Sequence, residues 1–377
     1  MALVLNEEQQ LLRDSAKTFL EECSPVEDLR KLRDAGEQWS PALWAEMAEM
    51  GWAGIVIPEA YGGLEFGHVG AGMLFEQCGR TLANSPLLSS ALVCASIVGS
   101  LGNEDQKHGL LPAMASGELT LTLALSEAVR FDPAATAMTA VPDGDGFVLN
   151  GNKVHVLDGL QAHRFLVVAR TSGQPGEQSG LSIFLVGNDA AGLNITSTLN
   201  ADNRLSCDIR FNAVHVGAND LIGKADMAWS ALEKALDIGA VCSAAEMLGI
   251  AQESFDRTIQ YLKERKQFGV PVGSFQALQH RLAQLFCELD LSRSVVLKAL
   301  QAIDNDSDER SILASVAKVK CGQTVKLAVN EAVQMHGGIG MTDEFDIGFF
   351  MKRAAGARQE YGDVYYHSDR FARLRGY

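Results

Sequence analysis

The chain has 377 residues, 47% of them hydrophobic, which is enough for substantial cores in two or three domains. Its formal net charge of −15 argues against a nucleic-acid partner, because binding to a phosphate backbone needs clustered Lys and Arg. The seven cysteines are scattered and form no CxxC pair, so we predict neither a disulfide framework nor a zinc site and expect a reducing cytoplasm. His280 and His336 have no further ligands at metal spacing, so no metal is assigned.

The N-terminal segment predicts an amphipathic helix and not a secretion signal. It lacks the basic start and apolar core of a signal peptide, whereas Leu12, Ala16 and Leu20 form an apolar stripe after a potential helix cap at Asn6. Residues 81–103 are uncharged and roughly long enough to span a membrane. Because this run contains a proline, asparagines and several serines, we predict helices buried in protein and no membrane span.

The spacing of apolar residues along the chain changes twice. Residues 1–120 carry apolar positions at helical spacing, whereas residues 121–225 contain short runs rich in Val, Ile and Phe that predict antiparallel strands, with a tight hairpin at Asn150-Gly151. The helical period returns over residues 226–377. Strands and helices do not alternate, so a Rossmann domain is not predicted, and a nucleotide cofactor would be held by other means.

Glu246 is the only charged side chain between Ile238 and Ala251, and no basic residue lies three or four positions away to pair with it on a helix. Two interpretations follow. An Arg or Lys from another element pairs with this carboxylate, or the group is kept basic for catalysis, because removal from water would raise its pKa.

Two glycine-containing segments are candidate cofactor contacts. In ERKQFGVPVGSFQALQH, Arg265 lies where a long predicted helix ends, a position that suits a diphosphate and a helix C-terminus equally well. In QMHGGIGM, the glycines either offer backbone N–H groups to an anion or simply end a helix.

Taken together, the two segments form a pattern that is specific for one protein family. The pattern R-x-x-F-G-x-P-x-x-x-F-Q, followed about sixty residues later by Q-x-x-G-G-x-G, resembles the acyl-CoA dehydrogenase family. Further matches in the same order are IPEAYGG (57–63), LPAMASGE (111–118), LALSE (123–127) and GNKVHVLDG (151–159). The resemblance covers nearly the whole chain and implies an α+β multi-domain fold. It would have an N-terminal helical domain (1–120), a central antiparallel β-barrel domain (121–225) and a C-terminal four-helix bundle (226–377).

The resemblance also implies FAD as the cofactor. The flavin ring would contact Leu125, Ser126, His155 and Leu157, and the FAD of a neighbouring subunit would contact Arg265, Phe268, Gln276, Gln334, Gly337 and Gly338. A tetramer is therefore expected. The chain departs from the family pattern at Ala128, where a proline is usual, and at Leu157, where a threonine commonly faces flavin N5.

The implied chemistry is α,β-dehydrogenation of an acyl-CoA thioester, for which a positioned base is indispensable. Tyr361 occupies the place where many members of the family carry a glutamate, and tyrosine is a poor base at neutral pH. Glu246 is the predicted base. It lies two helical turns, about 10 Å, from Gly239, which matches the base position of other branches, and the chain resembles bacterial dehydrogenases that carry a relocated catalytic glutamate on this helix. The adjacent Glu360 is the alternative.

The sequence therefore predicts a soluble FAD-dependent acyl-CoA dehydrogenase that passes electrons to an electron-transferring flavoprotein. Two alternatives remain open. One is a flavin oxidase or monooxygenase on the same fold. The other, suggested by Tyr361 and the altered SEAVR segment, is a subunit that needs a sister chain for activity, in a heterotetramer in place of a homotetramer.

Overall fold

The computed structural model describes residues 3–377 and begins with a layer of helices. These are α1 (Glu7–Cys23), α2 (Val26–Ala35), α3 (Pro41–Glu49), α4 (His68–Thr81), the π-helix η3 (Leu87–Cys94), α5 (Ala95–Leu101) and α6 (Glu104–Ala115), with short 3₁₀ turns η1 (Trp52–Gly54) and η2 (Glu59–Tyr61). The cap predicted at Asn6 is confirmed, because its side chain accepts a hydrogen bond from the backbone of Gln9 at 2.8 Å.

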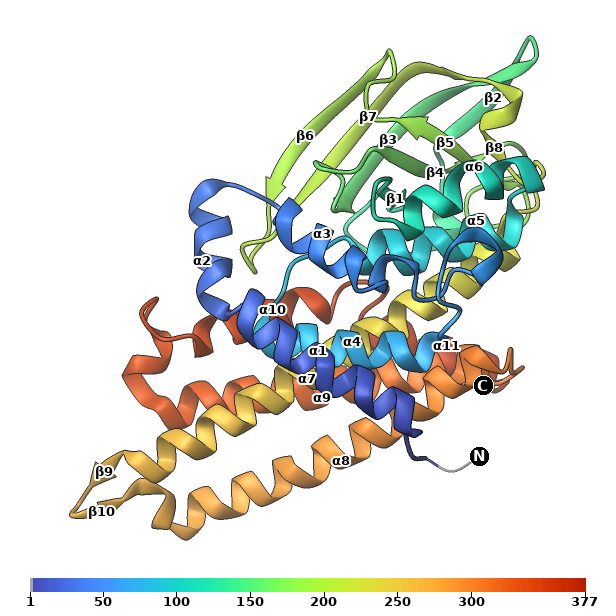
Figure 1. The fold of residues 1–377 in the computed structure, drawn as a ribbon. Coiled ribbons are helices and arrows are strands. Elements are labelled where there is room, and N and C mark those ends of the chain that lie inside the picture. Colours follow the sequence, from blue (N-terminus) through green and yellow to red (C-terminus); the bar gives the residue numbers. More distant parts are fainter. Residues whose placement is uncertain (1–2) are drawn as a thin grey trace.

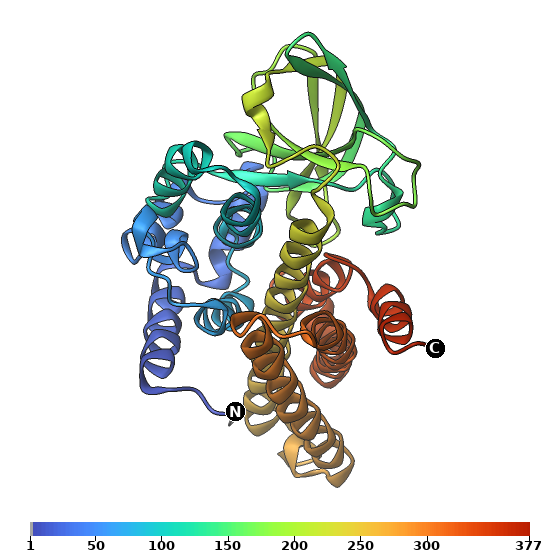
Figure 2. The same cartoon turned by 90° about the vertical axis from the view of Figure 1, so that its right-hand side faces the viewer.

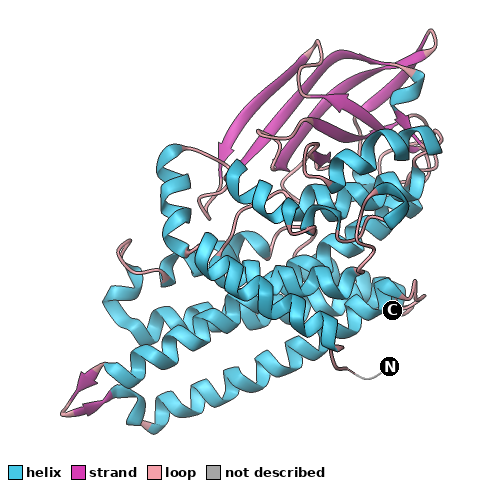
Figure 3. Ribbon diagram, in the orientation of Figure 1, coloured by secondary structure: helices cyan, strands magenta, loops and turns pink. Residues whose placement is uncertain are grey.

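A sheet follows, which Figures 1 and 3 show at one end of the molecule. Its strands are β1 (Leu121–Ala124), β2 (Thr139–Asp143), β3 (Gly146–Leu157), β4 (Arg164–Arg170), β5 (Leu181–Gly187), β6 (Leu193–Leu199), β7 (Leu205–Val216) and β8 (Leu221–Ile222), with 3₁₀ turns η4 (Pro133–Ala135) and η5 (Ala218–Asp220). The strand order is β6-β7-β3-β2-β4-β5-β8, with β1 paired to β4.

The predicted closed antiparallel barrel is wrong. The path ends on β6 at one side and on the two-residue strand β8 at the other, and these two strands are not paired. Pairing of β1 with β4 is parallel, and β2 meets β4 through the single parallel pair Thr139 and Arg170. The sheet is therefore open and mixed.

The hairpin predicted at Asn150-Gly151 is also wrong. Strand β3 runs straight through these residues, and the turn from β2 to β3 lies at Gly144-Asp145 instead. Asn150 accepts a hydrogen bond from the backbone of Ala213 at 2.9 Å, and the register between β3 and β7 shifts here. The Asn-Gly pair thus marks a β-bulge, in which a side chain at position 151 would collide with Met138.

The remaining chain is helical: α7 (Trp229–Glu264), α8 (Gln276–Asp304), α9 (Arg310–His336), α10 (Ile347–Ala357) and α11 (Val364–Leu374), with β9 (Lys266–Gln267), β10 (Val270–Pro271), η6 (Val272–Ser274) and η7 (Gly337–Met341). Figure 2 shows α7 running from the sheet through the helical part. Among residues 3–377 only α7 is long and apolar enough to cross a membrane, but 94% of its most apolar window is buried within the protein, as in a core helix.

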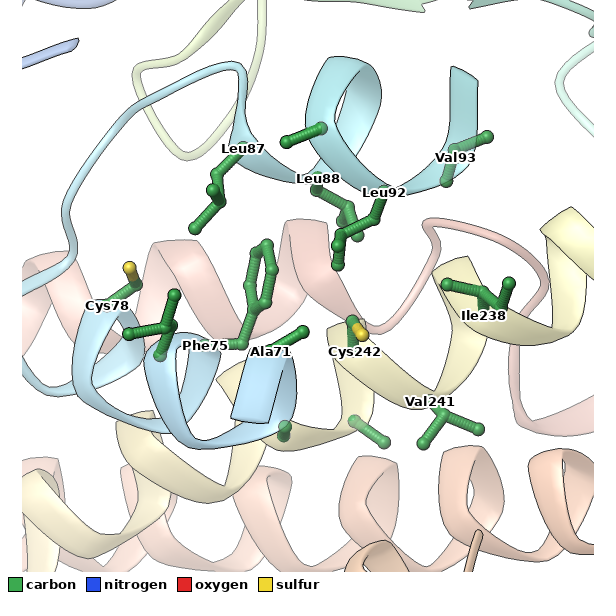
Figure 4. Packing of buried hydrophobic residues seen from close by; sticks show 14 of the residues in the cluster. Ala71, Phe75, Cys78, Leu87, Leu88, Leu92, Val93, Ile238, Val241 and Cys242 are labelled. Carbon is green, nitrogen blue, oxygen red and sulfur yellow. The ribbon is translucent and has the colours of Figure 1, made fainter. Parts of the chain in front are cut away.

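The uncharged run at residues 81–103 forms buried structure, as predicted. It is interrupted by a loop before η3 and α5, and every residue of η3 is buried. Figure 4 shows leucines of η3 packed over Phe75 of α4 and Cys242 of α7. This contact joins the N-terminal and C-terminal helices into one core beside the sheet.

Candidate functional site

A cleft of about 660 Å³ lies where the sheet meets the helices. Four of the predicted flavin contacts line it, namely Leu125, Ser126, His155 and Leu157. Leu236 of α7 and the loop residues Glu360 and Tyr361, between α10 and α11, complete the wall facing the helices. We call this space the cleft. The structure thus brings together residues that are far apart in the sequence, as the family resemblance implied.

Lys153, which the sequence motifs did not single out, supports the loop that carries Ser126. Its fully buried ammonium donates to the carbonyl oxygen of Leu125 at 2.9 Å and contacts Oε1 of Glu127 at 2.7 Å. Burial lowers the pKa of Lys153 to about 8, although the charge of Glu127 opposes that shift. The available signal was the lysine in the GNKVH motif, whose neighbour Val154 donates a backbone hydrogen bond of 2.8 Å to the carbonyl of Ser126.

Three residues around the cleft have left-handed backbones that non-glycine residues seldom adopt. They are His155 (φ 55°), Asp158 (φ 55°) and Tyr361 (φ 54°). A hydrogen bond of 2.9 Å from the backbone of His155 to Oδ1 of Asp208 helps to fix the first of them. Such conformations cost free energy and tend to gather at functional sites.

A second, much smaller pocket of about 40 Å³ lies behind the cleft. The two spaces share Leu157, Glu360 and Tyr361, which therefore form the wall between them. We call this space the inner pocket. Its other lining residues include Glu246 of α7, Arg353 of α10 and Asn84 of the loop before η3. Both predicted bases border the inner pocket, but only Glu360 also borders the cleft.

Glu246 is buried and paired, which corrects the expectation that its pKa is raised. Its Oε1 accepts a hydrogen bond of 2.6 Å from Nε of Arg353, whose other nitrogens donate to Oδ1 of Asn84 and the carbonyl of Ala83. Burial alone would raise the pKa of Glu246, but the charges of Arg353 and Arg204 outweigh it and lower that pKa. Spacing along α7 could not show this partner, because Arg353 lies on a different helix.

Glu360 is 6% exposed and takes part in a second buried ion pair. Its Oε1 contacts Nη2 of Arg204. Nε of the same guanidinium also binds Asp202 at 2.7 Å. Oε2 of Glu360 has no hydrogen-bond partner among residues 3–377. Nearby, Asp158 accepts a hydrogen bond of 2.6 Å from Ser89, and burial raises the pKa of Asp158 to about 6.

The second set of predicted FAD contacts lies at the opposite end of α7. Arg265 caps this helix, and the β9–β10 hairpin beyond it leaves Phe268 91% exposed. Tyr261 stacks on His336 at 4.3 Å between ring centroids, which holds the Gln334–Gly338 segment at the same end. Leu236 in the cleft and Arg265 are about 43 Å apart along the helix axis. One FAD molecule cannot contact both sets within one chain.

Sequence models of the N-terminal, middle and C-terminal domains of acyl-CoA dehydrogenases match residues 6–118, 122–214 and 228–367. A probable acyl-CoA dehydrogenase of Bacillus subtilis, YngJ, is 32% identical over 92% of this chain and 92% of its own length. The chain belongs to the acyl-CoA dehydrogenase family. Members of this family are flavin-dependent oxidoreductases, so an enzymatic role follows from membership.

Two further proteins are similar to this chain over nearly their whole length. The structure of the steroid ACAD Tcur3481-Tcur3483 superposes with a TM-score of 0.88 at 31% identity and covers 98% of both chains. A caffeyl-CoA reductase-Etf complex subunit, CarC of Acetobacterium woodii, is 28% identical over 92% of both proteins.

The chemistry of the residues that line the cleft fits a flavin ring. Leu125 and Leu157 present apolar side chains, and the hydroxyl of Ser126 has no partner among the described residues, so it is available to a polar ring edge. Within the same part of the chain, no cluster of His, Cys, Asp and Glu is arranged to hold a metal ion.

Proposed function

We propose that this chain catalyses the α,β-dehydrogenation of an acyl-CoA thioester to the trans-2-enoyl-CoA. FAD bound in the cleft would supply the acceptor for the β hydride. The observation that carries the proposal is the cleft itself, lined by the residues matching the family's ring contacts, with a buried carboxylate in its inner wall. The enclosing side chains would exclude water and hold the thioester while that carboxylate takes the α proton.

Glu360 is the better-supported base, and Glu246, the residue favoured by sequence reasoning, is the second candidate. Supporting Glu360 are its position on the wall of the cleft and its unpartnered Oε2, which leaves a lone pair free to accept a proton. Glu246 is ionised but bound by Arg353, and it lines only the inner pocket. It would need Tyr361 or Leu157 to move before it could meet substrate.

The experiment compares Glu360→Gln with Glu246→Gln after anaerobic addition of acyl-CoA. We expect both variants to retain FAD, and we expect Glu360→Gln to slow flavin bleaching by at least about 100-fold. Slow bleaching in Glu246→Gln alone would transfer the assignment to that residue. Unaltered bleaching in both variants would exclude both. Peroxide released in air at the rate of substrate oxidation would indicate the oxidase alternative.

We further propose that FAD is shared between subunits of a tetramer. Each chain would line the ring with its cleft and lend Arg265, Phe268, Gln276, Gln334, Gly337 and Gly338 to a neighbour. The length of α7 supports this arrangement, because it separates the two sets.

An electron-transferring flavoprotein is the proposed acceptor, supported by the Etf complex that contains the relative CarC. Domain limits at 120 and 225 and a cytoplasmic location stay proposals.

The sister-chain alternative is favoured by one observation. The inner pocket keeps only about 40 Å³ because the Arg353–Glu246 and Arg204–Glu360 pairs fill its surroundings. A chain whose acyl side is closed could serve chiefly to complete the FAD site of another subunit. Native mass measurement of the purified chain, followed by anaerobic reduction, separates the two: a homotetramer that bleaches with acyl-CoA excludes the need for a sister chain.

A further inference from the structure

Two hydrogen-bond acceptors of the inner pocket have no donor. Oε1 of Gln38 and Oε2 of Glu360 are enclosed, and neither has a partner among residues 3–377. Gln38 lies in the loop between α2 and α3 and is 3% exposed. Its Nε2 donates to the carbonyl of Leu205 at 2.7 Å, which orients the amide and leaves Oε1 as its free end. Buried acceptors in native proteins nearly always have a donor, so these two indicate a missing one.

The charges around the inner pocket indicate what kind of group would suit it. The charged lining residues are Asp158, Glu246, Glu360, Arg204 and Arg353. Each arginine already binds a carboxylate, so three acids face two engaged guanidinium groups. An anionic group would meet net negative charge, whereas a group that donates hydrogen bonds would meet the free Oε1 of Gln38.

The size of the pocket limits the group further. A volume of about 40 Å³ corresponds to roughly three water-sized spaces, at about 10–15 Å³ for each. It can accept the end of a chain but not a branched or cyclic group without rearrangement. Leu157 and Tyr361 form the wall between the two spaces, so an acyl chain would reach the pocket from the cleft once one of these side chains moves aside.

We propose that the inner pocket is a polar subsite for a hydroxyl or ammonium group at the far end of the acyl chain, with Oε1 of Gln38 as its acceptor, while Oε2 of Glu360 stays available for the α proton. This inference rests on the proposed function, because it places an acyl thioester in the cleft. It specifies a substrate class: short acyl thioesters that carry a terminal hydrogen-bond donor. Gln38 is then a specificity residue that takes no part in the chemistry.

The test measures calorimetric binding of matched CoA thioesters to the FAD-loaded protein. Acyl chains of four to six carbons would carry a terminal methyl, hydroxyl, ammonium or carboxylate group. We expect the best donor-bearing ester to bind about ten-fold more tightly than its methyl counterpart, which is the worth of about one net hydrogen bond, and the carboxylate ester to bind most weakly. Comparing the hydroxyl and ammonium series identifies which donor the pocket takes.

Variants assign the effect to the pocket. Gln38→Leu should remove most of the ten-fold preference, because the donor-bearing esters lose their acceptor and the methyl ester does not. The matched control is Gln161→Leu: Gln161 is hydrogen-bonded through both ends of its amide to the backbone of Trp39 and does not line the pocket, so this variant should keep the preference. If Gln38→Leu fails to fold, the four wild-type ester series still decide the matter.

Equal binding of methyl, hydroxyl and ammonium esters would overturn the inference and leave the pocket as a site for buried water. Tightest binding of the carboxylate ester would overturn it as well. So would the absence of detectable binding by all four esters. Flavin reduction is recorded separately on the same samples. Selective binding without reduction contradicts the proposed dehydrogenation but not the subsite, whereas reduction without selectivity contradicts only the subsite.

Discussion

The ring of Tyr361 packs directly against Gly239, because a Cβ atom at position 239 would lie only 2.6 Å from Cδ1 and Cε1 of the tyrosine ring. The sequence motifs predict these two residues to match positions at which the family carries its base. The absence of a side chain on α7 makes room for the ring, and the ring forms part of the wall between the cleft and the inner pocket. The glycine at position 239 and the tyrosine at position 361 are therefore coupled by packing.

The first prediction tests that coupling. Gly239→Ala should reduce the free energy of unfolding by about 1–3 kcal/mol, because the added methyl overlaps a buried ring that cannot retreat without strain. Tyr361→Ala alone should also destabilise, through the cavity that it leaves. The double variant should be more stable than the sum of the two effects predicts, and denaturant unfolding measures all three. Strict additivity would show that the two side chains do not share this space.

The second prediction concerns the buried pair of Glu246 and Arg353. Glu246→Gln should reduce the free energy of unfolding by about 3 kcal/mol or more, because it leaves the guanidinium buried without its counter-charge. Replacing both residues, as Glu246→Leu with Arg353→Met, should recover most of the loss. Chemical denaturation checks this.

The matched control for that pair is the exposed ion pair of Lys31 and Asp28 at 2.6 Å. Lys31→Met should change the free energy of unfolding far less than Glu246→Gln does, because solvent screens the pair. A small effect of Glu246→Gln, comparable to this control, would contradict the buried ion pair.

Local signals in the sequence predicted local structure well. The cap at Asn6, the buried run at 81–103 and the change from helix to strand near residue 121 depend on neighbours within a few residues, and the structure has them. The Asn150-Gly151 signal was local too, but its turn propensity gave way to pairing of β3 with β7, which forms a bulge there. Closure of the sheet depends on which edge strands meet, and no short window of sequence encodes that.

The candidate site shows the same limit. Family motifs located the residues of the cleft, because motif positions are preserved by the fold. The partner of Glu246 could not be predicted, since Arg353 lies 107 positions away on α10 and approaches only after the helices pack. Nor could the enclosure of Oε2 of Glu360, because burial of one carboxylate oxygen depends on segments that meet only in the folded chain.

The third prediction concerns the support of the cleft by Lys153. Lys153→Met should lower FAD affinity by at least about ten-fold, because it releases the carbonyl of Leu125 and the carboxylate of Glu127, which hold the loop carrying Ser126. Absorbance of the purified protein and FAD titration of the stripped protein measure this. Lys234→Met serves as control, since Lys234 pairs with Asp306 at the surface, away from the cleft. Equal FAD affinity in both variants would contradict the supporting role.

The fourth prediction is a pH dependence that originates at His367. This ring is almost fully buried, and its Nε2 contacts the carbonyl of Tyr361 at 2.9 Å. Burial, together with the charge of Lys318, lowers the pKa of His367 from 6.5 to about 3, so the folded protein holds the neutral ring. Between these values the unfolded chain binds more protons, and stability is therefore lost as the pH falls below about 6.5.

At about pH 5 this difference corresponds to roughly 2 kcal/mol relative to neutral pH. His367→Gln should lose less stability over the same interval, because glutamine does not titrate. Comparing the two proteins at each pH cancels the contributions of other groups, including Asp158, whose raised pKa of about 6 acts in the opposite direction. Parallel stability curves between about pH 7 and 4 would show that His367 binds its proton equally in the folded and the unfolded chain, which would contradict its lowered pKa.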